Sequence, residues 1–122
     1  LEEHIGDPIN KVEDIVLNIS YELPTELAAP TELREFFLQP GLFIMTWSYE
    51  PNPGQVWDDF RAERATSNEG PYEEIGIIDP GQNTCEDNTI ESGNDYYYRV
   101  RARNGVIYSE YSNIFHVTAP PA

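Results

Sequence analysis

The sequence predicts an all-β protein built as an antiparallel β-sandwich. Several short segments alternate apolar and polar residues at the period of two that a half-buried strand requires. Turn-forming sequences separate these segments at short intervals. The length of 122 residues suits one domain with a single hydrophobic core. Together these observations describe one sandwich-sized unit.

Two strands are expected between residues 42 and 66. In residues 42–49, one face carries Phe43, Met45 and Trp47 and the other carries Ile44, Thr46 and Ser48. The turn sequence Glu50-Pro-Asn-Pro-Gly54 closes this strand. In residues 57–66, Phe60 and Ala62 lie opposite a charged face formed by Asp59, Arg61 and Glu63.

The clearest alternation lies in residues 95–104. An apolar face carries Tyr96, Tyr98, Val100 and Ala102, and the other face carries Tyr97, Arg99, Arg101 and Arg103. The basic face raises three possibilities, namely a nucleic-acid stripe, a ligand platform or a structural surface. Shorter strands are expected at residues 72–78, 84–90 and 108–118, separated by the turns Asp79-Pro-Gly81 and Ser92-Gly93.

The net charge of the chain argues against a nucleic-acid stripe. The chain has 22 Asp and Glu residues against seven Lys and Arg residues, and its formal net charge is −15. Such a field repels phosphate backbones and anionic lipid surfaces. The longest apolar run is also far shorter than the roughly 20 residues of a membrane-spanning helix. Nucleic acid is therefore not an expected partner, and neither is a membrane span.

An ordered set of motifs resembles a fibronectin type III domain from about Ala28 to Thr118. The matching pieces are Ala29-Pro-Thr-Glu-Leu33 for the first strand, Trp47 for the core tryptophan, Ile90-Glu-Ser-Gly93, Tyr96 to Asn104, and Tyr111-Ser-Asn113. The sequence departs from the family pattern at Cys85, at Ser92 and at the short Asn104-Gly105 connection. The resemblance implies a seven-stranded antiparallel sandwich occupying residues 28–122, preceded by an arm of residues 1–27.

The resemblance also implies roles for single residues. Trp47, Phe60, Tyr96, Tyr98 and Val100 are expected in the scaffold core, with Tyr96 as a tyrosine corner whose hydroxyl bonds backbone upstream. The strand that carries Arg99 and Arg101 is expected beside residues 57–66, so that both arginines face Asp59, Arg61 and Glu63, with Glu63 and Asp59 as their counter-charges. Such cross-strand pairs contribute about 0.2–1 kcal/mol each, which favours a structural surface over a ligand platform.

No catalytic, cofactor or metal site is predicted, and the protein is not expected to be an enzyme. The two histidines, His4 and His116, lie far apart and have no nucleophile in a motif. Cys85 is the single cysteine, so neither a disulfide nor a zinc site can form within the chain. The paired carboxylates lack the spacing and glycine of a calcium loop. No Arg-Gly-Asp tripeptide is present.

The N-terminal arm is the least conventional part of the chain. Residues 12–23 are too rich in apolar and β-branched side chains for a free linker. An additional strand would place Ile15, Leu17, Ile19 and Tyr21 on one face, whereas Asp7-Pro8 followed by Ile9, Val12, Val16 and Ile19 also fits a capped helix. The strand interpretation predicts pairing with a sheet edge, with these four residues against a partner. Asn18-Ile-Ser20 matches a glycosylation triplet.

Two functions fit these features. The first is a structural or adhesive subunit of an extracellular or particle-surface assembly, filament-like and homo-oligomeric, in which the arm donates a strand to a neighbour. The alternative is an accessory spacer or binding module of a larger secreted enzyme or surface protein, with Thr118-Ala-Pro-Pro-Ala122 as a stiff linker. A chain that starts at Leu1 fits either a mature exported protein or a fragment.

Overall fold

The computed structural model describes residues 26–122, in which all the regular elements are β-strands. Eight strands are present in this range: β1 (Thr31–Gln39), β2 (Leu42–Ser48), β3 (Asp59–Ala65), β4 (Glu73–Ile78), β5 (Thr84–Asp87), β6 (Asp95–Asn104), β7 (Ile107–Tyr108) and β8 (Phe115–Thr118). The all-β prediction is confirmed. The predicted arm residues Ile15, Leu17, Ile19 and Tyr21 lie outside the described residues.

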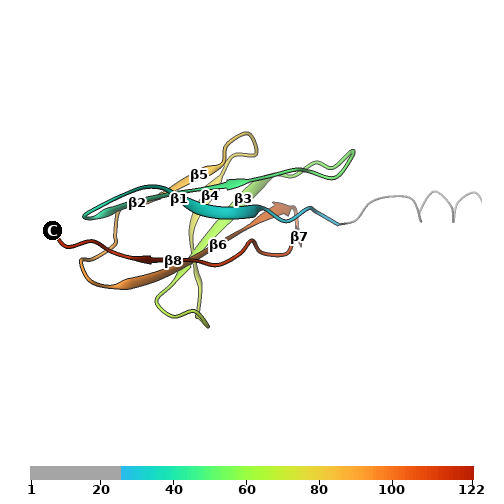
Figure 1. Ribbon diagram of the computed structural model, residues 1–122. Helices are drawn as coiled ribbons and strands as arrows, with labels where there is room; N and C mark the ends of the chain where they lie inside the picture. Colours follow the sequence, from blue (N-terminus) through green and yellow to red (C-terminus); the bar gives the residue numbers. More distant parts are fainter. Residues whose placement is uncertain (1–25) are drawn as a thin grey trace, which may run out of the picture.

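The strands form two antiparallel sheets that pack face to face (Figure 1). One sheet has the order β1-β2-β5, and the other has the order β4-β3-β6 with β7 and β8 on the far side of β6. Since β7 pairs with the end of β6 and β8 with its beginning, the two short strands together fill one edge position. The eight segments thus occupy the seven strand positions that the sequence predicts.

The prediction of one continuous strand over residues 108–118 is wrong, because the middle of this segment is not a strand. The chain leaves the sheet between β7 and β8, and two serine hydroxyls replace the missing strand partner. The N–H of Ala102 donates to Ser109 Oγ at 2.9 Å, and the N–H of Val100 donates to Ser112 Oγ at 3.1 Å. The backbone N–H groups of the same serines donate to the carbonyls of Ala102 and Val100. All four backbone groups of β6 are thereby satisfied without a regular ladder.

Two other strand limits also differ from those expected. The first strand does not end at Leu33 but continues to Gln39, with bulges that shift its register against β2. The strand expected over 84–90 ends at Asp87, because the side chain of Asp87 accepts the N–H of Thr89 in a local turn.

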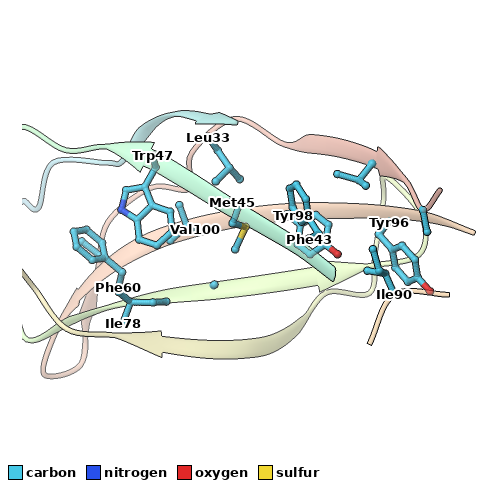
Figure 2. Close-up of a cluster of buried hydrophobic side chains, with 14 residues drawn as sticks. Leu33, Phe43, Met45, Trp47, Phe60, Ile78, Ile90, Tyr96, Tyr98 and Val100 are labelled. Atoms are coloured by element: carbon cyan, nitrogen blue, oxygen red, sulfur yellow. The ribbon is translucent and has the colours of Figure 1, made fainter. Parts of the chain in front are cut away.

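The core lies between the sheets and is lined by the alternating apolar faces of β2, β3 and β6 (Figure 2). Trp47 and Phe60 contact edge to face with ring centroids 5.4 Å apart, and Phe43 packs on Tyr98 at 4.8 Å. All five residues expected in the scaffold core are buried in this cluster. Each large apolar side chain buried in this way contributes about 1.5–3 kcal/mol to folding.

The turn before β6 fixes the entry of that strand. Gly93 adopts the left-handed conformation with φ of 82°, which a residue with a side chain rarely accepts. Tyr96 Oη accepts the N–H of Glu91 at 2.9 Å, five residues earlier in the chain. This is the upstream backbone contact that the resemblance implies for Tyr96.

The described chain begins and ends at opposite ends of the sandwich (Figure 1). Residues 26–28 lie beside the β2–β3 loop, where Gln55 Oε1 accepts the N–H of Ala28 at 2.9 Å. The chain then enters β1, an edge strand. The amide side chain of Asn113 bonds both the N–H and the carbonyl of Leu33, at 2.8 Å and 3.0 Å, and so ties the start of β1 to the other sheet.

Candidate interaction surface

The basic face of β6 is occupied by the protein's own side chains. The Arg99 guanidinium lies between the rings of Tyr72 and Tyr111, with Cζ 4.0 Å and 3.7 Å from their centroids. Arg101 lies over Tyr108 at 3.9 Å and near Tyr111 at 4.6 Å. The arginines and tyrosines alternate across the sheet, a stacked arrangement in which each cation is held against a ring.

Glu63 on β3 lies beneath this stack. Its Oε1 accepts from Arg99 Nε at 2.7 Å, and its Oε2 accepts the hydroxyl of Tyr111 at 2.9 Å. Burial, together with the hydrogen bond to Glu63, raises the pKa of Tyr111. Arg101 reaches the same carboxylate at 3.9 Å. A charged ligand would have to displace these partners, which supports the structural interpretation of the face.

The pairing with Asp59 differs from the expected one. Arg101 lies directly opposite Arg61, not opposite a carboxylate, and Asp59 lies opposite Arg103. The Asp59 carboxylate accepts from Arg103 at 2.7 Å and from Arg61 at 2.9 Å. The hydrogen bond from Arg103 is the main cause that lowers the pKa of Asp59. The registry of β3 against β6 decides these partners, and the sequence alone did not specify it.

Asp87 is a buried polar centre that the sequence analysis missed. Its Oδ2 accepts from the Tyr98 hydroxyl at 2.7 Å and from Arg64 at 2.9 Å, and its Oδ1 accepts from Thr89. Burial opposes the charge of Asp87, but hydrogen bonds from Thr89, Tyr98 and Arg64 hold its pKa below the ordinary value. The sequence places Asp87 beside Glu86, a pair that resembles any exposed acidic cluster.

The thiol of Cys85 is packed between two strands. Burial raises the pKa of the Cys85 thiol to about 11, and a side-chain carbon at Gly76 would lie only 2.8 Å from its sulfur. The thiol thus fills the space beside a glycine where β5 approaches β4.

Within residues 26–122, no three His, Cys, Asp or Glu side chains gather as a metal site would require. The described part of the chain also contains no helix long and apolar enough to cross a membrane.

Exposed apolar side chains gather at two places. On β1, Phe36 is 66% exposed and Phe37 is 43% exposed, next to the bulge in that strand. At the end of the sandwich where the described chain begins, the exposed Val56 lines a hollow of about 190 Å³ together with Leu27 and Ile107, and Val106 is exposed next to Ile107 in the chain. Exposed apolar side chains on a strand edge are typical of a surface that pairs with another chain.

No protein-family model matches the chain, and no curated protein matches its sequence. Among solved structures, the sixth fibronectin type III domain of human fibronectin type III domain containing protein 3 superimposes with a TM-score of 0.69 over 84% of this chain and 93% of that chain, at 14% identity. The protein has the fibronectin type III fold.

Two bacterial structures are similar as well. An Fn3-like protein from Clostridium thermocellum matches with a TM-score of 0.64 and 24% identity, over 80% of this chain and 98% of that chain. The β-1,2-glucanase from Parabacteroides distasonis matches with a TM-score of 0.65 and 24% identity, over 83% of this chain and 14% of the enzyme. At these identities the likeness shows the fold alone, since this fold serves many functions.

Proposed function

We propose that the protein is a non-catalytic structural or adhesive subunit of an extracellular or particle-surface assembly, in which the N-terminal arm adds a strand to a neighbouring copy. One observation carries the proposal. Residues 31–118 fill all the strand positions of the sandwich, so its two sheets need no strand from residues 12–23. An apolar, strand-like segment that its own domain does not need is suited to pair with another molecule.

Two further features support a binding role over catalysis. The polar clusters of the described residues are bonded among themselves, as on the face of β6 and around Asp87. The hollow beside Leu27 measures about 190 Å³, whereas ligand pockets usually measure about 300–1,000 Å³. Fibronectin type III domains are commonly modules of extracellular proteins, in keeping with a location outside the cell. A head-to-tail contact made by a donated strand gives a ring or an open filament.

The proposal is tested by the size of the full chain in solution. Light scattering over a range of concentrations should show assemblies larger than one chain. Replacing Leu17 and Ile19 together with Asp should leave a monomer, because carboxylates would be buried in the paired strand. The matched control replaces Asn18 and Ser20 with Asp, which adds the same charge on the alternate face. A wild-type chain that stays monomeric at all concentrations would rule the proposal out.

The alternative is an accessory spacer or binding module within a larger secreted enzyme. The likeness to a segment that makes up 14% of a β-1,2-glucanase chain favours it. A spacer is monomeric when isolated and needs only polar connections at its ends. The same light-scattering experiment therefore separates the two functions.

A further inference from the structure

The sandwich offers four strand edges to an added strand, and they differ in charge and continuity. The small sheet ends in β1 and β5, and the large sheet ends in β4 and in the pair β7 and β8. Strand addition needs a continuous run of free backbone groups with side chains that suit the incoming segment. The second requirement concerns charge. Residues 12–23 contain Glu13, Asp14 and Glu22 and no cation, so the edge that accepts them must not be acidic itself.

The edges at β4 and β5 do not suit such a segment. These two strands approach each other across the sandwich, with Cys85 packed beside Gly76. They carry the exposed acids Glu73, Glu74 and Glu86 and contain no cation. Like charges on paired strands are destabilising, so an acidic arm is disfavoured here.

The edge formed by β7 and β8 lacks continuity. The chain leaves the sheet between them, and each strand is short, with two residues in β7 and four in β8. The side chains of Ser109 and Ser112 turn inward there to bond β6. A segment of seven alternating residues, from Ile15 to Tyr21, finds no matching length of strand at this edge.

The second half of β1 comes nearest to both requirements, since its one acid, Glu35, is balanced by the neighbouring Arg34. Among the described strands, β2 is the one that pairs with β1, and Asn113 occupies its outer side at Leu33. The stretch Arg34–Gln39 beyond that point carries a half-exposed arginine and the exposed rings of Phe36 and Phe37. Bulges and charged side chains are two separate devices that protect a strand edge from pairing. The bulge in β1 nevertheless leaves the ring of Phe36 exposed, so this edge presents an apolar surface.

The arm is poorly placed to cover this edge on its own domain. Residue 26 lies at the end of the sandwich from which β1 starts (Figure 1). An arm that folded back along its own β1 would first run beside residues 26–33, where Asn113 holds the edge. Leu33 lies as many residues after Glu26 as Ile19 lies before it, so an arm that turned back at Glu26 would place Ile19 opposite Leu33. Asn113 already bonds the backbone of Leu33, and the arm would bring only Ile15 and Leu17 to Arg34–Gln39 of its own β1. A second copy offers that stretch to more of the apolar face.

We infer that the β1 edge from Arg34 to Gln39 accepts the N-terminal arm of a second copy, a proposal that rests on the proposed strand donation. The apolar face of the arm packs on Phe36 and Phe37, and its carboxylates lie near Arg34. The small sheet then continues from one molecule into the next through the added strand.

Full-length variants with separate lesions test this inference. An edge variant carries Phe36→Asp and Phe37→Asp, and an arm variant carries Leu17→Asp and Ile19→Asp. Each alone should be monomeric, with the dissociation constant raised about tenfold or more over wild type. Mixed together they should form a one-to-one complex, because the intact arm of the edge variant meets the intact β1 of the arm variant. Ile77→Asp, on the equally exposed edge of β4, is the control and should assemble like wild type.

The outcomes separate the two proposals. If the edge variant assembles like wild type while the arm variant does not, strand donation stands and β1 is not the acceptor. If the mixture of edge and arm variants stays monomeric, the assignment of complementary roles is wrong. If wild type itself is monomeric, both proposals fail. Circular dichroism and thermal melting confirm folding of every variant, since the substituted phenylalanines lie outside the core.

Discussion

At the scale of single residues, Trp47 stabilises the sandwich through apolar contact. Its ring is fully buried, and its Nε1 has no hydrogen-bond partner in the described part of the chain. Trp47→Ala should therefore lower the free energy of unfolding by about 3–5 kcal/mol, as other large aromatic truncations do. Trp47→Phe should lower it by less, since no hydrogen bond is lost. Urea denaturation of both variants checks the order, and equal losses would contradict it.

Asp87 should give the fold a dependence on acid pH. Its pKa is lowered in the folded state, so its contribution is present above the ordinary carboxyl pKa of about 4 and is lost as pH falls through the lower folded value. Asp87→Asn should cost about 2–4 kcal/mol at neutral pH, because Tyr98 and Arg64 lose a charged acceptor. The difference from wild type should shrink below pH 4.

Urea denaturation at pH 7, 5 and 3 measures this dependence. The neighbouring carboxylate provides the control, since the side chain of Glu86 is exposed and Glu86→Gln should change little at any of the three pH values. A difference between Asp87→Asn and wild type that stays constant from pH 7 to pH 3 would show that the charge of Asp87 does not contribute.

At the scale of the strand, β6 uses two of its three outward arginines, Arg99 and Arg101, unequally. Arg99 is stacked between two rings and bonded to Glu63 at 2.7 Å, whereas Arg101 reaches that carboxylate only at 3.9 Å. We expect Arg99→Ala to cost about 2 kcal/mol, more than the limit of about 1 kcal/mol for an exposed pair, and Arg101→Ala to stay within that limit. Arg99→Lys should recover little, because an ammonium cannot stack as a planar guanidinium does. Thermal melting ranks the three variants, and a larger loss in Arg101→Ala would reverse this interpretation.

The elements that sequence reasoning predicted well are those with one buried and one solvated face. In β2 and β6 the period of two largely follows burial, so the core residues of these strands, from Phe43 to Ala102, could be assigned from the pattern. In β3 the apolar residues Phe60 and Ala62 could be assigned in the same way, but Asp59 and Glu63 on its charged face are buried as well. The break between β7 and β8 could not, because Ser109 and Ser112 satisfy β6 through hydroxyls in a stretch that still reads as strand. Likewise Arg34–Gln39 lies at an edge with mostly exposed side chains, and burial leaves no alternation there. The partners of Asp59 and Asp87 depend on strand register and on contacts distant in sequence, for which no local signal exists.

At the scale of the whole molecule, charge is the dominant surface property. Each of the six arginines lies within 4 Å of a carboxylate, yet the acidic residues far outnumber the basic ones and leave a net charge of −15. Apart from the exposed pair of Arg34 and Glu32, the arginine pairs are local and partly buried, so salt weakens them little. Repulsion among exposed carboxylates acts over longer distances and is screened. Self-repulsion destabilises a compact state and opposes contact between like-charged copies.

Raising the ionic strength should therefore stabilise both the fold and the assembly. The melting temperature should rise between about 10 mM and 150 mM NaCl, as the screening length falls from about 30 Å to 8 Å. Light scattering should show the assembly shifting to lower protein concentration over the same range, because the acidic arm of one copy approaches the acidic body of the next. The edge variant at β1 separates the two effects, since its melting temperature should rise with salt while it remains a monomer. A melting temperature that falls with salt would mean that the arginine pairs outweigh the repulsion within the fold.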